Sequence, residues 1–273
     1  MQSWAKRDFF TYSILFVLLF IRFPIADFVL FLEQFFKPFV LSANLDNLRS
    51  LQDQSNHFLY NYSFILVLVV IVVNRNNLKE LNIDKIFILI LLSGRLSYHR
   101  GATQTLWLVV MDLLLICVGV LYVKGWLKFG DIEPTLLRVT LLIVIAFLSI
   151  LFINDTVNIT KIGWAVQLYE NEISMVLVEE IMFRGMLWMF LKNLNFSEIQ
   201  IVVLQAILFW LSHVYIANDN PFFFWVIVPI ASIILGAVVW RTRSITSSTI
   251  AHMLFNIWWA LFLDAKFIGI AAN

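Results

Sequence analysis

Apolar runs of about 16 to 20 residues recur along this chain, close to the ~20 residues that a helix needs to cross a bilayer. Lipid-facing strands are not expected, because they would leave backbone hydrogen bonds unsatisfied. The sequence therefore predicts an all-α bundle of about eight transmembrane helices within one integral-membrane domain, residues 1–273. The predicted spans lie near 9–30, 58–73, 104–123, 135–153, 172–191, 199–217, 221–240 and 246–263.

Composition supports a multi-pass membrane protein and excludes several other classes. The chain is 61% hydrophobic and 14% charged, with a mean hydropathy of +0.88, well beyond the balance of a soluble domain. A net charge of +1 lacks the basic footprint of a nucleic-acid-binding protein. The single cysteine, Cys117, excludes an intramolecular disulfide and a cysteine-based zinc site.

The ends of the predicted spans leave some choices open. The first run resembles a signal peptide but lacks a small-residue cleavage site, so we interpret it as a retained membrane helix. Residues 31–41 fit either an interfacial helix or part of a second span, and residues 86–93 are too short to cross. The distribution of Lys and Arg between the two sides favours cytoplasmic termini.

The segment VEEIMFRG places three charges inside an apolar run. Ionisable residues in membrane helices are costly and indicate function. Glu180 and Arg184 are four apart and share a helix face, so we expect them to pair. Glu179 points about 100° away from Glu180 on a regular helix, so it competes poorly for the same arginine. A carboxylate in that position is suited to general acid–base catalysis.

Two further motifs follow in the next spans. His213 ends the string FWLSH, while His252 and Asn256 lie four apart in HMLFN and share one helix face. At 1.5 Å per residue, Glu179, His213, His252 and Asn256 all fall in the same half of the bilayer. Each motif alone is more often a helix–helix contact. The ordered set at one depth favours a catalytic site.

This ordered set, EExxxR then FxxxH then HxxxN, resembles the CAAX-protease and bacteriocin-processing (CPBP, or Abi) family of intramembrane proteases. That family includes the type II CAAX prenyl endopeptidases. The resemblance covers about residues 165–265. It implies a helical bundle with a cavity open to the cytosol and to lipid. It also implies a peptide or lipidated protein as the substrate.

The resemblance further implies a role for each matching residue. Glu179 would be the catalytic glutamate, and His213 its partner in activating a water. His252 and Asn256 would stabilise the oxyanion. Glu180 and Arg184 would form the supporting pair. The scheme needs no serine or cysteine nucleophile, because activated water and oxyanion donors suffice for peptide hydrolysis.

Three alternatives stay open. Glu179, His213 and His252 could instead bind a catalytic zinc ion, although the HExxH string is absent, and we favour a site without a cofactor. A non-catalytic membrane immunity protein that sequesters a peptide would carry the same cavity. A transporter could use intramembrane Glu and His as proton relays, but inverted repeats are not apparent.

Overall fold

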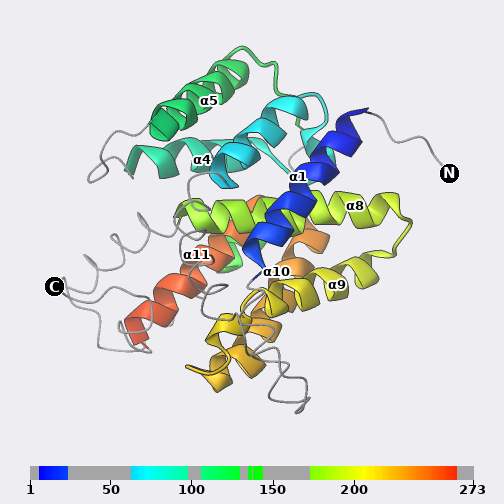
Figure 1. Ribbon diagram of the computed structural model, residues 1–273, viewed down its shortest axis with the longest axis vertical. Coiled ribbons are helices and arrows are strands. Elements are labelled where there is room, and N and C mark those ends of the chain that lie inside the picture. Colours follow the sequence, from blue (N-terminus) through cyan, green and yellow to red (C-terminus); the bar gives the residue numbers. More distant parts are fainter. Residues whose placement is uncertain are drawn as a thin grey trace, which may run out of the picture.

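The computed structural model describes residues 6–23, 63–97, 106–129, 135–136, 138–143 and 173–262, and within them it contains helices and no strand. The elements, in chain order, are α1 (Lys6–Arg22), the helix Ser63–Val73, η1 (Leu78–Leu81), α4 (Lys85–Ser97), α5 (Leu106–Val123), helical residues among 135–143, the helix 173–179, η3 (Glu180–Leu187), α8 (Trp188–Asn193), α9 (Glu198–Leu211), η4 (Val214–Ile216), η5 (Phe223–Ile227), α10 (Val228–Thr242) and α11 (Ile245–Phe262). Figure 1 shows their arrangement.

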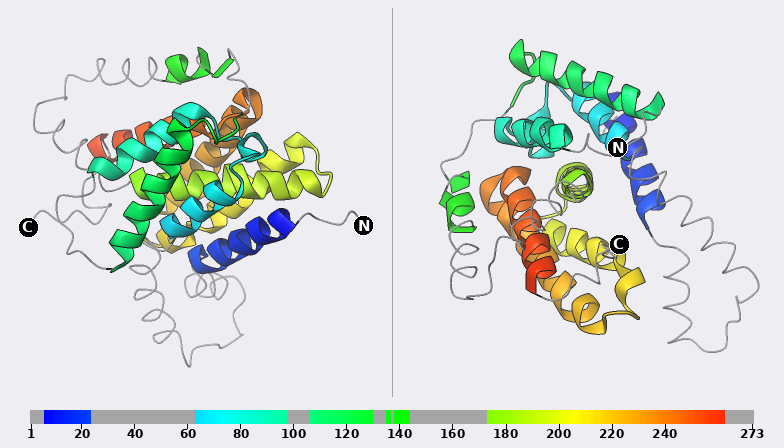
Figure 2. Two further views of the ribbon diagram at one scale, coloured as in Figure 1. Left: turned by 90° about the horizontal axis from the view of Figure 1, so that it is seen from above. Right: turned by 90° about the vertical axis from the view of Figure 1, so that its left-hand side faces the viewer.

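One helix lies at the centre of the bundle. Residues 173–179, η3 and α8 continue one another as a single helix, which we call the central helix (173–193). The right-hand view of Figure 2 looks along it and shows other helices on every side. All eight residues of η3 are buried, and α1, α9, α11 and η1 pack against it. The predicted catalytic segment therefore lies in the core of the protein.

The middle of the central helix is π-helical rather than α-helical. Its hydrogen bonds over η3 join residues five apart, which widens the turn. Such stretches are uncommon and are often found at functional sites. The π-helical stretch begins at Glu180, so the α-helical spacing used to interpret VEEIMFRG holds only up to Glu179.

Local signals end the helices where the chain must turn back. Asn195 adopts the left-handed conformation (φ 63°) after α8, and Arg243 does so (φ 54°) after α10. The side chains of Ser197 and Gln200 form a reciprocal cap at the start of α9. These turns join α8 to α9 and α10 to α11, and the helices of each joined pair contact each other.

Polar contacts join the N-terminal half to the central helix. Tyr12 contacts the amide of Asn193 at the end of α8. Asn74 holds α1 against the end of the helix Ser63–Val73 by donating to the Thr11 hydroxyl at 2.9 Å. Gly185 allows η1 to approach, since a side chain there would bring its Cβ to 3.1 Å from the Leu81 carbonyl oxygen. The first half of the chain thus supports the segment that carries the predicted site.

The outer surface of α10 fits contact with lipid. Ile230, Ile233 and Ile234 are each more than half exposed, at 52%, 51% and 53%. Within the described part of the chain, Phe223–Thr242 is the one helix that is long and apolar enough to cross a membrane. The all-α prediction is confirmed over the described residues. Eight spans and a single domain stay predictions.

Some of the predicted helix boundaries agree with the structure and others do not. Residues 86–93 belong to α4, a helix of 13 residues. The predicted helix over 199–217 is wrong at its end, because α9 stops at Leu211 and a turn follows. Residues 31–41, much of the span 135–153 and the part of the first span beyond residue 23 lie outside the described residues.

Candidate active site

The string EEIMFR forms a buried ion pair at the start of η3. Arg184 Nη1 lies 3.2 Å from Glu180 Oε1, and both side chains are fully buried. The two residues are four apart, so the contact joins successive turns of the central helix. A buried pair of this kind leaves an uncompensated charge when either partner is removed.

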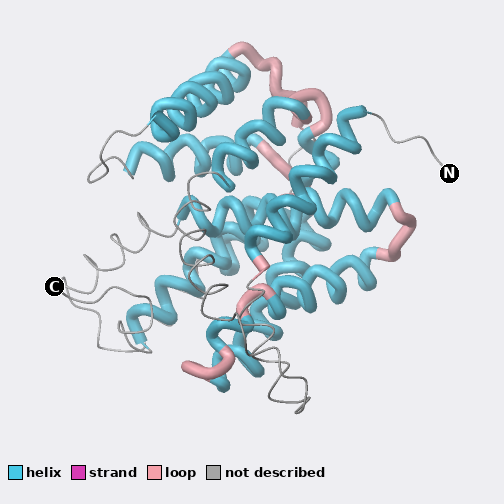
Figure 3. The backbone as a smooth tube through the Cα atoms, viewed as in Figure 1, coloured by secondary structure: helices cyan, strands magenta, loops and turns pink. Residues whose placement is uncertain are grey.

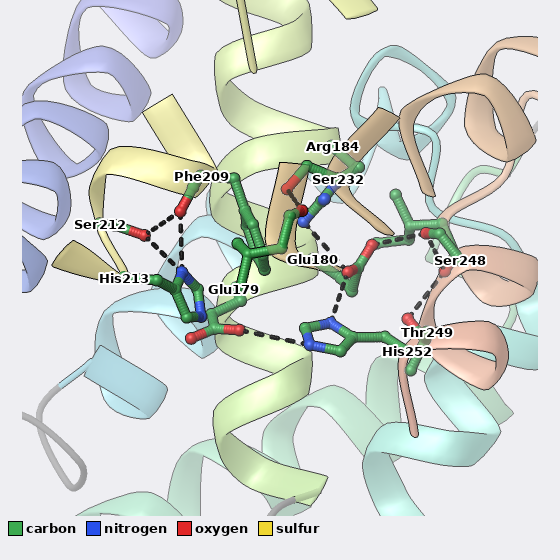
Figure 4. A network of polar contacts seen from close by, with 12 residues as sticks. Glu179, Glu180, Arg184, Phe209, Ser212, His213, Ser232, Ser248, Thr249 and His252 are labelled. Carbon is green, nitrogen blue, oxygen red and sulfur yellow. Dashed lines mark hydrogen bonds and ion pairs between the residues drawn. The ribbon is translucent and has the colours of Figure 1, made fainter. Parts of the chain in front are cut away.

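His252, on α11, lies between the two neighbouring carboxylates. Its Nδ1 is 2.9 Å from Glu180 Oε1, and its Nε2 is 3.7 Å from Glu179 Oε2. Figure 4 shows the imidazole with one nitrogen toward each glutamate. Because a carboxylate accepts, we assign the ring proton on this side to Nδ1. From the sequence, Glu180 was expected to pair with Arg184 only, and its contact with His252 was not predicted.

Ser248 adds a third contact to Glu180. Its hydroxyl donates to Glu180 Oε2 at 2.6 Å, from the turn of α11 that precedes His252. Sequence reasoning did not single out this residue. The run SITSSTIAH, rich in hydroxyls between apolar segments, was a signal that could have found it. Glu180 is thus bonded by three side chains from two elements.

Glu179 has different surroundings, although it is only 4% exposed. Its distance of 3.7 Å from His252 Nε2 is longer than a hydrogen bond. In Figure 4 its carboxylate points toward the imidazoles of both His213 and His252. Catalytic hydrogen bonds are often long until the substrate binds. Glu179 therefore faces the two predicted catalytic histidines and not the Glu180–Arg184 pair.

His213 lies in the turn after α9, not inside a helix as the sequence suggested. Its Nδ1 is 2.8 Å from the Phe209 carbonyl oxygen, and the Ser212 hydroxyl donates to the same oxygen at 2.7 Å. These side-chain bonds satisfy a helix-end carbonyl and favour the turn. Because a carbonyl only accepts, Nδ1 carries the proton and Nε2 of the neutral ring keeps a lone pair.

The phenylalanine of the FxxxH motif connects the two halves of the site. The Arg184 guanidinium carbon lies 4.3 Å from the centre of the Phe209 ring. The rings of His213 and His252 lie 4.5 and 5.7 Å from it, centre to centre. A cation over an aromatic face is attracted by the ring quadrupole. Phe209 thus contacts three polar site residues, a role that the sequence analysis did not assign.

Asn256 lies one turn beyond His252 on α11 and is partly buried. Helical spacing puts both residues on one face, as the sequence predicts. Its side chain makes no hydrogen bond to the other described site residues. Its predicted oxyanion role stays a prediction.

The zinc alternative also stays a prediction. Among the described residues, no three His, Cys, Asp or Glu side chains are grouped to hold a metal ion. His213 and His252 both direct Nδ1 to protein oxygens, so each would offer only Nε2 to a metal.

Comparison with known proteins gives one match. Residues 161–258 match a family model described as type II CAAX prenyl endopeptidase Rce1-like. The matched segment contains all six predicted site residues. No curated protein and no solved structure matches the chain. The match confirms the family predicted from the three motifs, and with it a membrane protease in general terms.

Proposed function

Because residues 161–258 belong to the matched endopeptidase family, we propose that this chain is an intramembrane endopeptidase that cleaves a membrane-associated peptide or protein tail. The observation that carries the proposal is the arrangement around His252. One nitrogen is held by Glu180 at 2.9 Å, while the other faces Glu179 at 3.7 Å. A carboxylate beside an oriented imidazole in a buried site can handle protons during hydrolysis.

In the proposed reaction, Glu179 and His213 activate a water molecule. The water oxygen attacks the scissile carbonyl carbon, and its proton passes to Glu179 or to Nε2 of His213. The C–N bond then breaks, and that proton goes to the departing amine, leaving a new carboxylic acid and a new amine. General-base catalysis of this kind contributes about 10²- to 10⁴-fold.

His252 and Asn256 are proposed to stabilise the oxyanion. When His252 carries a proton on both ring nitrogens, its positive charge and that of Arg184 balance the negative charges of Glu179 and Glu180. Its Nε2–H, which lies beyond hydrogen-bond distance of Glu179, could then donate to the developing oxyanion. One such donor is worth about 10²- to 10³-fold in kcat. The Asn256 amide is the second proposed donor.

The deciding experiment uses purified full-length protein with Glu179→Ala and His213→Ala, measured on candidate peptides. We expect both changes to abolish cleavage while the protein stays folded. Glu198→Gln is the control, because that carboxylate is partly exposed on the surface, at the start of α9. Full activity in both site variants would refute the proposal.

Metal dependence is tested on the same preparation. We favour a metal-independent, glutamate-dependent site, so incubation with a chelator should leave cleavage unchanged. Activity that disappears with the chelator and returns with zinc would instead assign Glu179, His213 and His252 as ligands.

The substrate class needs a paired comparison. The name of the matched family indicates prenylated substrates, so we propose a lipid-modified tail. One peptide should be offered with and without its prenyl group, in vesicles containing the protein. Faster cleavage of the prenylated form would support this substrate class, while equal rates would favour processing of unmodified peptides.

A further inference from the structure

The loop before α4 is bonded to both elements that carry the candidate active site. Asn82 donates from its side-chain amide to the Arg184 carbonyl oxygen at 3.0 Å. Its own carbonyl accepts from the backbone of Ile245, the first residue of α11, at 2.9 Å. Asn82 adopts the left-handed conformation (φ 55°), which asparagine tolerates better than most residues. One residue therefore contacts η3 on one side and α11 on the other.

Asp84, two residues later, makes the same link through its side chain. It is only 6% exposed. Oδ1 accepts from the backbone of Ile86 at 2.8 Å and of Phe87 at 3.0 Å, which caps the start of α4. The carboxylate also accepts from the hydroxyl of Thr246 at 2.8 Å and from the hydroxyl of Ser244.

The α11 partners of Asp84 fix the start of that helix. The Ser244 hydroxyl accepts from the backbone of Thr246 at 3.0 Å, so Ser244 caps α11. Asp84 thus binds both the cap and the first turn. His252 follows Thr246 by six residues, about 9 Å along a rigid helix. A rotation of the helix start is therefore passed on to the imidazole.

We propose that Asp84 is a positioning residue for the active site, because it sets the rotation of α11 and thereby the placement of His252 between Glu179 and Glu180. Only the effect on catalysis rests on the proposed function; the placement of His252 by Asp84 does not. Active-site groups must be held within about 10–20° and 0.5 Å of the productive geometry. Asp84 lies outside the matched segment 161–258, so this assigns a role in catalysis to the N-terminal half of the chain.

Thr246→Val is the sharpest test, because it removes one hydroxyl from the link to Asp84 and leaves the cap of α4 intact. The matched control is Thr249→Val. Thr249 is equally buried on α11, at 1% exposure, but its hydroxyl bonds only within the helix, to the Ile245 carbonyl at 2.7 Å. Thr246→Ser keeps the hydroxyl and serves as the rescue variant. Asp84→Asn keeps a capping oxygen and tests the carboxylate itself.

Two readouts separate positioning from simple support of the fold. The first is the NMR signal of the His252 Nδ1 proton in protein labelled at histidine, which reports its bond to Glu180 without any need for activity. The second is the split between kcat and KM. We expect Thr246→Val and Asp84→Asn to shift the proton signal. We also expect both to lower kcat by about 10- to 100-fold with KM within about twofold.

The outcomes are distinct. The proposal is supported if Thr246→Ser keeps the wild-type signal and rate and Thr249→Val changes neither. It is overturned if Thr246→Val leaves the His252 signal unchanged, or if Thr249→Val perturbs that signal equally. If the wild-type protein cleaves no peptide, the proposed function fails, while the NMR arm alone still decides whether Asp84 positions His252.

Discussion

The two carboxylates of the EExxxR motif are adjacent in sequence but lie in different surroundings. Glu180 is fully buried and bonded by Arg184, His252 and Ser248. Glu179 faces both His213 and His252, and its carboxylate lies 3.7 Å from His252 Nε2. Both oxygens of Glu180 already accept hydrogen bonds, so this carboxylate can hold the geometry of its neighbours. Glu179, which faces the two predicted catalytic histidines, is the carboxylate that we propose acts on a water.

Glu179→Gln should distinguish the role of Glu179 from that of Glu180 most clearly. We expect cleavage to fall by about 10²- to 10⁴-fold, the contribution of a general base, since the amide cannot take a proton. Stability should change less than in Glu180→Gln, because the pair of Glu179 with His252, at 3.7 Å, is looser than the fully buried pair of Glu180 with Arg184, at 3.2 Å. The measurement is kcat on the preferred peptide beside unfolding in mixed micelles. Glu180→Gln is the contrast, and it should lower stability as well as rate. If Glu179→Gln unfolded as easily as Glu180→Gln, Glu179 would support the structure as much as Glu180 does, which would contradict the proposed difference between them.

Arg184→Met should have the largest effect on folding. It leaves Glu180 buried without its cation, which typically costs about 3–5 kcal/mol in free energy of unfolding. Denaturant titration in micelles measures it. The double variant Glu180→Gln with Arg184→Met removes both charges and should recover part of the loss. No recovery would mean that packing against Phe209, and not charge, carries the effect.

Contacts within one helix could be predicted from the sequence, whereas contacts between helices could not. The spacing of Glu180 and Arg184 predicted a contact that local helical geometry brings about. Spacing could not predict that His252, 72 residues further on, would bond to Glu180, because that depends on how α11 packs against the central helix. His213 was misplaced for a related reason. Hydropathy alone does not reveal that its own side chain and Ser212 bond to Phe209 and favour a turn.

Ser248→Ala should lower the free energy of unfolding by less than Arg184→Met, because it removes only one of the three side-chain contacts to Glu180. The lost hydrogen bond to a charged group is worth about 1.5–3 kcal/mol of unfolding free energy. Ser13→Ala is the control, because that hydroxyl is exposed and bonds only to the Phe9 carbonyl of its own helix. Equal stabilities of the two variants would show that Ser248 adds nothing to the support of Glu180.

Arg243→Ala should have the least effect. Its ion pair with Glu198 is at the surface, with the two side chains 42% and 29% exposed, and surface pairs are worth about 0–1 kcal/mol and weaken with salt. Unfolding at low and high ionic strength measures this. A loss as large as that of Arg184→Met would overturn the view that burial decides the value of an ion pair in this chain.

The π-helical stretch also limits how this segment can vary in length. A π turn holds more residues than an α turn, so deleting one residue between Glu180 and Leu187 would let the segment relax into a regular α-helix. The helix beyond it, α8 included, would keep nearly its present orientation, because the wider turns had taken up the extra residue, but a deletion before Arg184 would shorten the Glu180–Arg184 spacing from four residues to three. Side-chain replacements between Glu180 and Arg184 keep this spacing, whereas insertions and deletions do not. Related sequences that keep the site should therefore vary here in residue type and not in residue number.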